Sequence, residues 1–166
     1  MTSTTYWTTI DSPLGQLLLT ADEHGITGLH MDGDVYGNQP GAEWVEDASR
    51  FDNVRRQLEE YFAGDRTEFD LPLRPVGTPF QHEVWAALQT IPYGEVRSYR
   101  EIAAQIGRPG ASRAVGLANG RNPIAVIVPC HRVIGASGAL TGYGGGLHRK
   151  RLLLDLEGRR AEPALI

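Results

Sequence analysis

Apolar and polar positions alternate in short runs over the first part of the chain and follow a helical period afterwards. Three apolar-rich runs, at 6–10, 16–21 and 26–31, are separated by the turn signals DSPLG and EHG, and they predict a β-meander. Residues 49–62 then predict a helix that stops at Gly64, with an apolar stripe made of Phe51, Val54, Leu58 and Phe62.

Three further helices are predicted from the residues at their boundaries. The first begins after Thr78, with a proline at its first position and Gln81 completing a capping box. The second begins after Ser98, with Glu101 completing another capping box. The third, SRAVGLANG, has Ser112 as its cap and ends at Gly120. Because a tight glycine-containing turn joins the last two, the pair is typical of a helix-turn-helix.

The remaining segments predict a strand, a helix and a linker. Residues 121–129, RNPIAVIVP, predict a turn followed by a buried strand, and residues 147–158 predict a last helix ending at Gly158. Residues 70–77 contain two prolines and predict an extended linker, so we place a domain boundary at Pro75.

The two predicted domains carry opposite charge. Residues 1–75, predicted to form an antiparallel sheet with a helix, hold 14 acidic and 5 basic residues, a net charge of −9. Residues 76–166, predicted to be mainly helical, hold 6 acidic and 11 basic residues, a net charge of +5. The basic half would attract a polyanion such as DNA. The same charges fit two surfaces that dock on each other, so charge alone leaves both interpretations open.

The chain has a single cysteine, Cys130, in the stretch VPCHRVIG. One cysteine excludes an internal disulfide and a multi-cysteine zinc site. A free thiol suits a reducing compartment, and we find neither a signal peptide nor a membrane-spanning run, so we expect a cytoplasmic protein. Because free cysteines are among the most buried residue types, Cys130 fits a small core residue as well as a nucleophile.

The neighbours of Cys130 favour a reactive thiol, because only the thiolate is nucleophilic and a base must take its proton. However, adjacent residues of an extended strand point to opposite faces, so His131 reaches Cys130 only if the backbone turns or a water bridges them. The other ring nitrogen of His131 would need a carboxylate to orient it, and Glu157 is the best candidate. The alternative is a core histidine satisfied by backbone groups.

The helix pair supplies a second group of candidates. Arg113 stands at the start of the second helix, where helix-turn-helix proteins present DNA-reading side chains. The small residues that follow it permit close approach of DNA or of another helix. Tyr99 fits a phosphate or stacking contact, or a half-buried aromatic residue. The basic residues 149–151 fit phosphate contacts or a solvated helix face.

Four motifs occur together in one order: SYxEIA, SRAVGxANGxNP, PCHRV and GxLTGYGGG. Their combination closely resembles the methylated-DNA–protein-cysteine methyltransferases, the repair proteins for O6-alkylguanine, from about Phe80 to Glu157. The resemblance implies an RNase H-like N-terminal domain and a winged-helix-like C-terminal domain. It also implies no cofactor, no metal, and a monomer, cooperative on DNA in some settings, that acts on double-stranded DNA containing O6-alkylguanine, and on O4-alkylthymine.

The resemblance implies that Cys130 accepts the alkyl group. His131 would deprotonate the thiol through a water, and Glu157 would orient the imidazole. The product is a thioether, which has no good leaving group, and the chain has no second cysteine to resolve it. The reaction should therefore stop after one event per molecule.

The resemblance also implies how DNA is held. Tyr99 would press on the phosphate and act in the reaction, Arg113 would fill the vacated stack, and Asn122 would brace the helix-turn-helix as a hinge. Further DNA contacts would come from Ser112, Ala114, Asn119, Gly120 and Arg121, and the base pocket would be formed by Tyr143, Val133, Gly144, Gly145 and Lys150.

The chain departs from some relatives in its N-terminal domain, where it lacks the cysteines of a structural zinc site, and at Gly144, where some relatives carry a hydroxyl residue. A non-catalytic branch has tryptophan in place of Cys130, which favours the catalytic branch here. Two other functions remain as alternatives. A lesion sensor would protect cells equally well after Cys130→Ala, and a cysteine hydrolase would turn over repeatedly on an acyl substrate.

Overall fold

The computed structural model describes residues 4–31, 40–135, 143 and 146–161. Its first half contains a four-stranded sheet in the order β3-β2-β1-β4, in which β4 pairs with β1 in parallel and the other pairs are antiparallel. The predicted meander is confirmed, and the strands are β1 (Tyr6–Ile10), β2 (Leu17–Ala21), β3 (Ile26–Met31) and β4 (Val45–Glu46).

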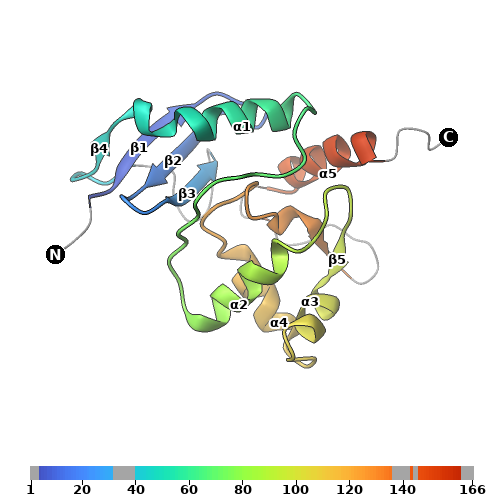
Figure 1. The fold of residues 1–166 in the computed structure, drawn as a ribbon. Coiled ribbons are helices and arrows are strands. Elements are labelled where there is room, and N and C mark those ends of the chain that lie inside the picture. Colours follow the sequence, from blue (N-terminus) through green and yellow to red (C-terminus); the bar gives the residue numbers. More distant parts are fainter. Residues whose placement is uncertain (1–3, 32–39, 136–142, 144–145, 162–166) are drawn as a thin grey trace.

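A helix covers one face of this sheet (Figure 1). It begins with a short 3-10 turn, η1 (Ala48–Phe51), and continues as α1 (Asp52–Phe62), close to the predicted range. The predicted stripe faces the core, with Phe51, Val54 and Leu58 buried and Phe62 partly buried against it. Tyr61, which is not part of the predicted stripe, is fully buried beside it.

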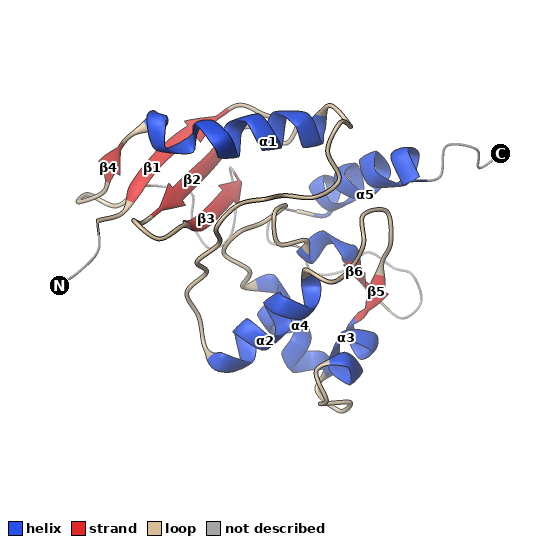
Figure 2. Cartoon of the chain, viewed as in Figure 1, coloured by secondary structure: helices blue, strands red, loops and turns tan. Residues whose placement is uncertain are grey.

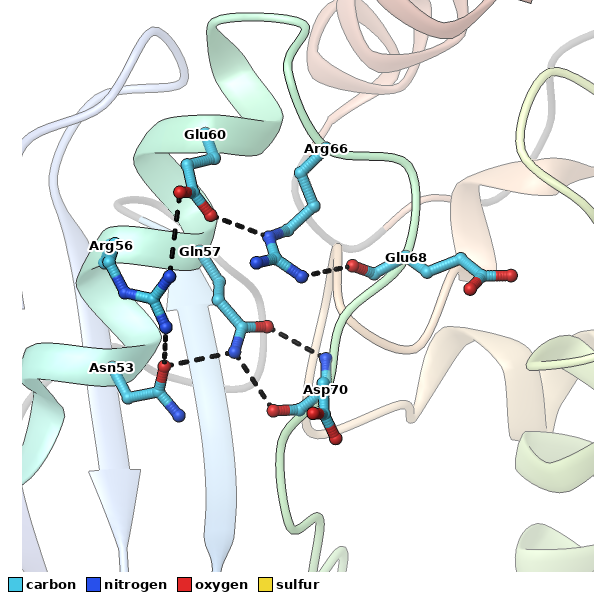
Figure 3. Close-up of polar contacts among 7 residues, drawn as sticks. All are labelled: Asn53, Arg56, Gln57, Glu60, Arg66, Glu68 and Asp70. Carbon is cyan, nitrogen blue, oxygen red and sulfur yellow. Dashed lines mark hydrogen bonds and ion pairs between the residues drawn. The ribbon is translucent and has the colours of Figure 1, made fainter.

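The linker after α1 is extended, as predicted, and is bonded to the first half of the chain. The Gln57 side chain makes two hydrogen bonds to the Asp70 backbone, donating to its carbonyl at 3.0 Å and accepting from its N–H at 2.9 Å (Figure 3). Arg66 donates to Glu60 at 2.9 Å and fixes the turn that follows the helix. The division of the chain at residue 75 stays a prediction.

The second half is mainly helical (Figure 2). The capping boxes predicted at Thr78 with Gln81 and at Ser98 with Glu101 are both confirmed. Ser112 is not a cap, because the helix starts one residue earlier than expected and Ala111 is its N-cap. The elements are α2 (Pro79–Leu88), β5 (Arg97–Ser98), α3 (Tyr99–Gln105), α4 (Ser112–Gly120), η2 (Cys130–Arg132), β6 (Val133–Ile134) and α5 (Leu147–Ala161).

The segment 121–129 is not the strand that its apolar residues predict. It forms turns that are buried from residue 124 onward, with a parallel bridge from Ile124 to Leu29, and Val126 has a left-handed φ of 71°. The Asn122 side chain holds the turn by bonding backbone groups on both sides of it. The last helix does not end at Gly158 as expected but continues to Ala161, and a Cβ at Gly158 would meet open space.

The α+β class is therefore confirmed, with the sheet and α1 in the first half and the helices in the second. One core runs through both halves and includes Leu29, Tyr61, Trp85, Val115 and Leu153. Within the described ranges, no helix is long and apolar enough to cross a membrane.

Candidate active site

The backbone coils at the cysteine. Cys130, His131 and Arg132 form the 3-10 helix η2, in which the Cys130 N–H donates to Val128 at 2.8 Å and the Arg132 N–H donates to Pro129 at 3.0 Å. All three side chains are buried, and Cys130 is 5% exposed. Because this segment is not an extended strand, the objection that Cys130 and His131 must face opposite ways does not apply.

Glu157 of α5 meets His131 as predicted. His131 Nε2 lies 2.7 Å from Glu157 Oε2, and both side chains are almost completely buried. Burial alone would raise the pKa of the Glu157 carboxyl, but the hydrogen bonds from His131 and Arg132 hold it well below its usual range. An ionised Glu157 requires a proton on His131 Nε2, which leaves Nδ1 with a lone pair.

Burial lowers the pKa of His131 below its ordinary value, although the bond to Glu157 acts in the opposite direction. The imidazole is therefore neutral at physiological pH. Nδ1 is buried and has no hydrogen-bond partner among the described residues. A neutral imidazole with an unpaired Nδ1, on the residue that follows the only cysteine of the sequence, has the protonation state that a general base requires.

Arg132 clamps Glu157 in place. Its Nε donates to Oε1 at 2.8 Å and its Nη2 donates to Oε2 at 3.0 Å, while Nη1 donates to the Ile91 carbonyl at 2.7 Å. Two parallel bonds to one carboxylate fix its orientation. From the sequence, Arg132 is only one of the neighbours that favour a reactive thiol at Cys130, and its bonds to Glu157 are not predicted.

Tyr61 also reaches the site, from α1 in the first half of the chain. Its hydroxyl donates to Glu157 Oε2 at 2.5 Å, and both groups are buried. The two residues are separated by 96 positions. Nothing local in the sequence marks this contact, because Tyr61 has the pattern of an ordinary aromatic residue of an amphipathic helix.

Lys150 of α5 lies inside the molecule. It is 0% exposed, and its Nζ donates to the Val133 carbonyl at 2.5 Å. Burial lowers its pKa to about 8, partly opposed by the nearby Cys130. The interpretation of residues 149–151 as phosphate contacts or a solvated face is therefore wrong for Lys150. Arg149 is also partly buried and donates to the Leu14 carbonyl at 3.0 Å.

Two asparagines tie α4 to the cysteine segment. Asn122 donates to the Val128 carbonyl at 2.8 Å and accepts from the Ile124 N–H at 3.0 Å. Asn119, expected to contact DNA, is 1% exposed and donates to the Cys130 carbonyl at 3.3 Å. This corrects its assignment, because position 119 lies on the inner face of α4, where its amide positions the backbone of Cys130.

The outer face of α4 is open. Its exposed residues are Arg113, Ala114 and Leu117, followed by Arg121 just after the helix, and Leu117 is 69% exposed. Ser112 and Gly120 are partly exposed at the two ends. The half-buried Tyr99 lies beside the helix, since a Cβ at Gly116 would be 3.7 Å from its ring. An exposed helix face with small side chains, an arginine near its start and another just after its end can approach a polyanion closely.

The predicted base pocket is only partly described. Val133 is buried in β6, which pairs with β5, and Tyr143 is half-buried and packs against the core. Gly144 and Gly145 lie outside the described residues.

Sequence profiles described as "6-O-methylguanine DNA methyltransferase, ribonuclease-like domain" and "6-O-methylguanine DNA methyltransferase, DNA binding domain" match residues 5–75 and 79–159. The first match confirms a ribonuclease-like fold.

Similar proteins cover nearly the whole chain. A methylated-DNA–protein-cysteine methyltransferase of Mycobacterium tuberculosis is 59% identical over 157 residues, 94% of each chain. One from Methanosarcina acetivorans is 56% identical over 154 residues, 92% of this chain and 98% of the relative. The crystal structure of Mycobacterium tuberculosis OGT in complex with DNA is similar with a TM-score of 0.88 and 58% identity, covering 93% of this chain and 94% of that one.

Proposed function

The chain belongs to the 6-O-methylguanine DNA methyltransferase family, and on this premise we propose that Cys130 is the side chain that accepts the alkyl group. The protein is a DNA-repair methyltransferase that binds DNA. The observation that carries the proposal is the buried bond between His131 and Glu157 directly beside the only cysteine.

The thiol is activated by His131. Glu157 holds the proton of the imidazole on Nε2, and Nδ1 takes the thiol proton through a water. The buried ammonium of Lys150 favours the thiolate that results, because an adjacent positive charge lowers the pKa of a thiol.

The thiolate then attacks the alkyl carbon on O6 of guanine. The new S–C bond forms as the C–O6 bond breaks, and the bond electrons leave with the base, which is protonated by Tyr99 or Tyr143. O4-alkylthymine presents the same alkyl–oxygen group and is a second substrate. The thioether product has no route back to a thiol, so each molecule acts once.

The outer face of α4 is the DNA contact. The O6 atom lies inside the duplex, so the lesion must be flipped out at a cost of a few kcal/mol. Arg113 fills the space that the nucleotide leaves, and Tyr99 presses on the phosphate. Asn122 keeps α4 in register with the cysteine segment as a hinge. Neighbouring contacts come from Ser112, Ala114, Gly120 and Arg121.

The protein acts as a monomer on double-stranded DNA, in the cytoplasm, where the thiol stays reduced.

A turnover count tests the proposed function. Duplex DNA containing O6-methylguanine is supplied in large excess, and the demethylated guanine is quantified over time. We expect a plateau at one guanine per protein molecule. Continued turnover would contradict transfer to a cysteine that nothing regenerates.

Replacing Arg113 with alanine should slow repair of duplex DNA by about ten- to a hundredfold, because part of the few kcal/mol needed for extrusion is lost. Repair of the same lesion in single-stranded DNA should change far less. Arg56→Ala, which removes an exposed arginine of α1, is the matched control. Equal duplex repair by Arg113→Ala and wild type would contradict the assigned role.

The free energy of unfolding should fall as the pH is lowered from 7 to 4. The folded-state pKa values of His131 and Glu157 both lie below their ordinary values of 6.5 and 4.5. The unfolded chain therefore binds protons that the folded chain does not, first at His131 below about pH 6.5 and then at Glu157 below about pH 4.5. Urea denaturation at several pH values measures the loss. His24→Gln, at an exposed histidine, should follow the wild-type curve, and a flat curve for wild type would contradict the buried neutral imidazole.

A further inference from the structure

The ring of Tyr61 lies in an aromatic part of the core that an apolar side chain could fill. The ring of Tyr61 packs at 5.3 Å from both Phe62 and Phe69 and at 6.3 Å from Tyr93. Phenylalanine would fill the same space without burying a hydroxyl, which costs free energy unless it is hydrogen-bonded. The hydroxyl donates to the one carboxylate that binds His131.

Tyr61 donates to the same Glu157 oxygen, Oε2, that binds His131. Glu157 Oε2 accepts from the Tyr61 hydroxyl at 2.5 Å, from His131 Nε2 at 2.7 Å and from Arg132 Nη2 at 3.0 Å. Oε1 accepts only from Arg132 among the hydrogen bonds described for this carboxylate. The position of Oε2, and the share of negative charge that it offers His131, therefore depend on three donors rather than on the pair alone.

We propose that Tyr61 is a positioning residue for methyl transfer, through which the first half of the chain sets the strength and direction of the bond between Glu157 and His131. The inference rests on the proposed role of His131 as the base for Cys130. It assigns the ribonuclease-like half an indirect part in the chemistry, through Glu157 and His131, in addition to its part in the fold.

Tyr61 is itself held by the first half. It lies one helical turn after Gln57, whose side chain is bonded to the Asp70 backbone, so that α1 and the linker fix each other (Figure 3). The far end of α1 points toward α5, which carries Glu157 (Figure 1). Because Tyr61 belongs to α1 and Glu157 to α5, the placement of α1 against α5 sets the bond between these two side chains.

Removing the Tyr61 hydroxyl should raise the pKa of His131. The charged groups that act on His131 are Glu157 and Lys150 from α5 and Arg132 from η2, and Tyr61 from α1 acts through Glu157. Without the phenol, Oε2 offers more of its charge to the imidazole, which favours the imidazolium and raises the pKa of His131. His131 is then protonated, and so unable to accept the thiol proton, at a higher pH than in the wild type.

The test compares Tyr61→Phe with the wild type in single-turnover methyl transfer from duplex O6-methylguanine between pH 5 and 9. We expect the rate at neutral pH to fall about tenfold, as for loss of one hydrogen bond to a charged group. The acid limb of the profile should move to higher pH by roughly half a unit. Affinity for the duplex should be unchanged. Tyr6→Phe, at a tyrosine of β1 that stacks on Arg50, is the matched control and should change neither property.

A second variant guards against loss of folding. Site-specific 3,5-difluorotyrosine at position 61 keeps the ring and makes the hydroxyl a stronger donor, so the acid limb should move to lower pH, opposite to Tyr61→Phe. An unchanged pH profile in both variants overturns the inference, as does a lower rate with an unshifted profile, because that is the result of a purely structural role. If the wild type itself transfers no methyl group to Cys130, the proposed function fails instead.

Discussion

Replacing Cys130 with serine should abolish methyl transfer while leaving binding of lesion-containing DNA intact. A hydroxyl is a weak nucleophile at its free pKa, and the imidazole that suffices for a thiol would have to remove a far more tightly held proton. Serine differs from cysteine by one atom, so the space that this 5% exposed side chain fills changes little. Transfer of a labelled methyl group measures the first property and fluorescence anisotropy with the lesion duplex measures the second.

The same variant separates repair from sensing. A lesion sensor would protect cells equally well with serine as with cysteine, whereas a methyl acceptor would lose protection completely. Survival of cells treated with a methylating agent is the readout. Full protection by Cys130→Ser would show that the protein protects cells without using Cys130 as an acceptor.

Replacing Glu157 with glutamine should both slow transfer and destabilise the fold. The carboxylate accepts bonds from Tyr61, His131 and Arg132, all of them donors, and the amide nitrogen of glutamine would face at least one of them. Arg132 would keep a buried charge without its anionic partner, which costs about 3–5 kcal/mol. The imidazole would lose the anion that orients it, so we expect a rate loss of about 10²- to 10⁴-fold.

Urea denaturation gives the stability change, and single-turnover transfer measured well below the denaturation midpoint gives the rate. Glu59→Gln, at an exposed position of α1, is the matched control and should be close to wild type in both. A Glu157→Gln protein with wild-type stability and rate would show that the buried carboxylate neither holds Arg132 nor orients His131.

The sequence predicts local structure well where the determinants are local. The capping boxes at Thr78 and Ser98 are made by residues three apart, so their side chains meet whenever the helix forms. The strands of the meander are similarly marked by their turns. The segment 121–129 fails for the opposite reason. Its apolar composition reports burial, but the path of the backbone is set by Asn122 and by contact with β3.

In the candidate site, too, the contacts that the sequence does not predict join residues far apart in the chain. His131 and Glu157 are matched from the sequence because a histidine needs an orienting carboxylate and few candidates are present in the second half. The resemblance places Asn119 at the DNA, whereas it lies on the inner face of α4 and donates to the Cys130 carbonyl, a contact with a segment eleven residues away that the helix sequence does not mark. The contact of Tyr61 with Glu157 joins two halves of the chain and is set by how α1 packs, which no local pattern encodes.

The central claim is that Cys130 takes the methyl group. Its most direct test is to react the protein with an equal amount of duplex O6-methylguanine, digest it, and locate the modification by tandem mass spectrometry. We predict a gain of one CH₂ on the Cys130 sulfur in nearly every molecule, and none after reaction with unmodified duplex. A demethylated duplex with an unmodified Cys130 peptide would contradict the claim.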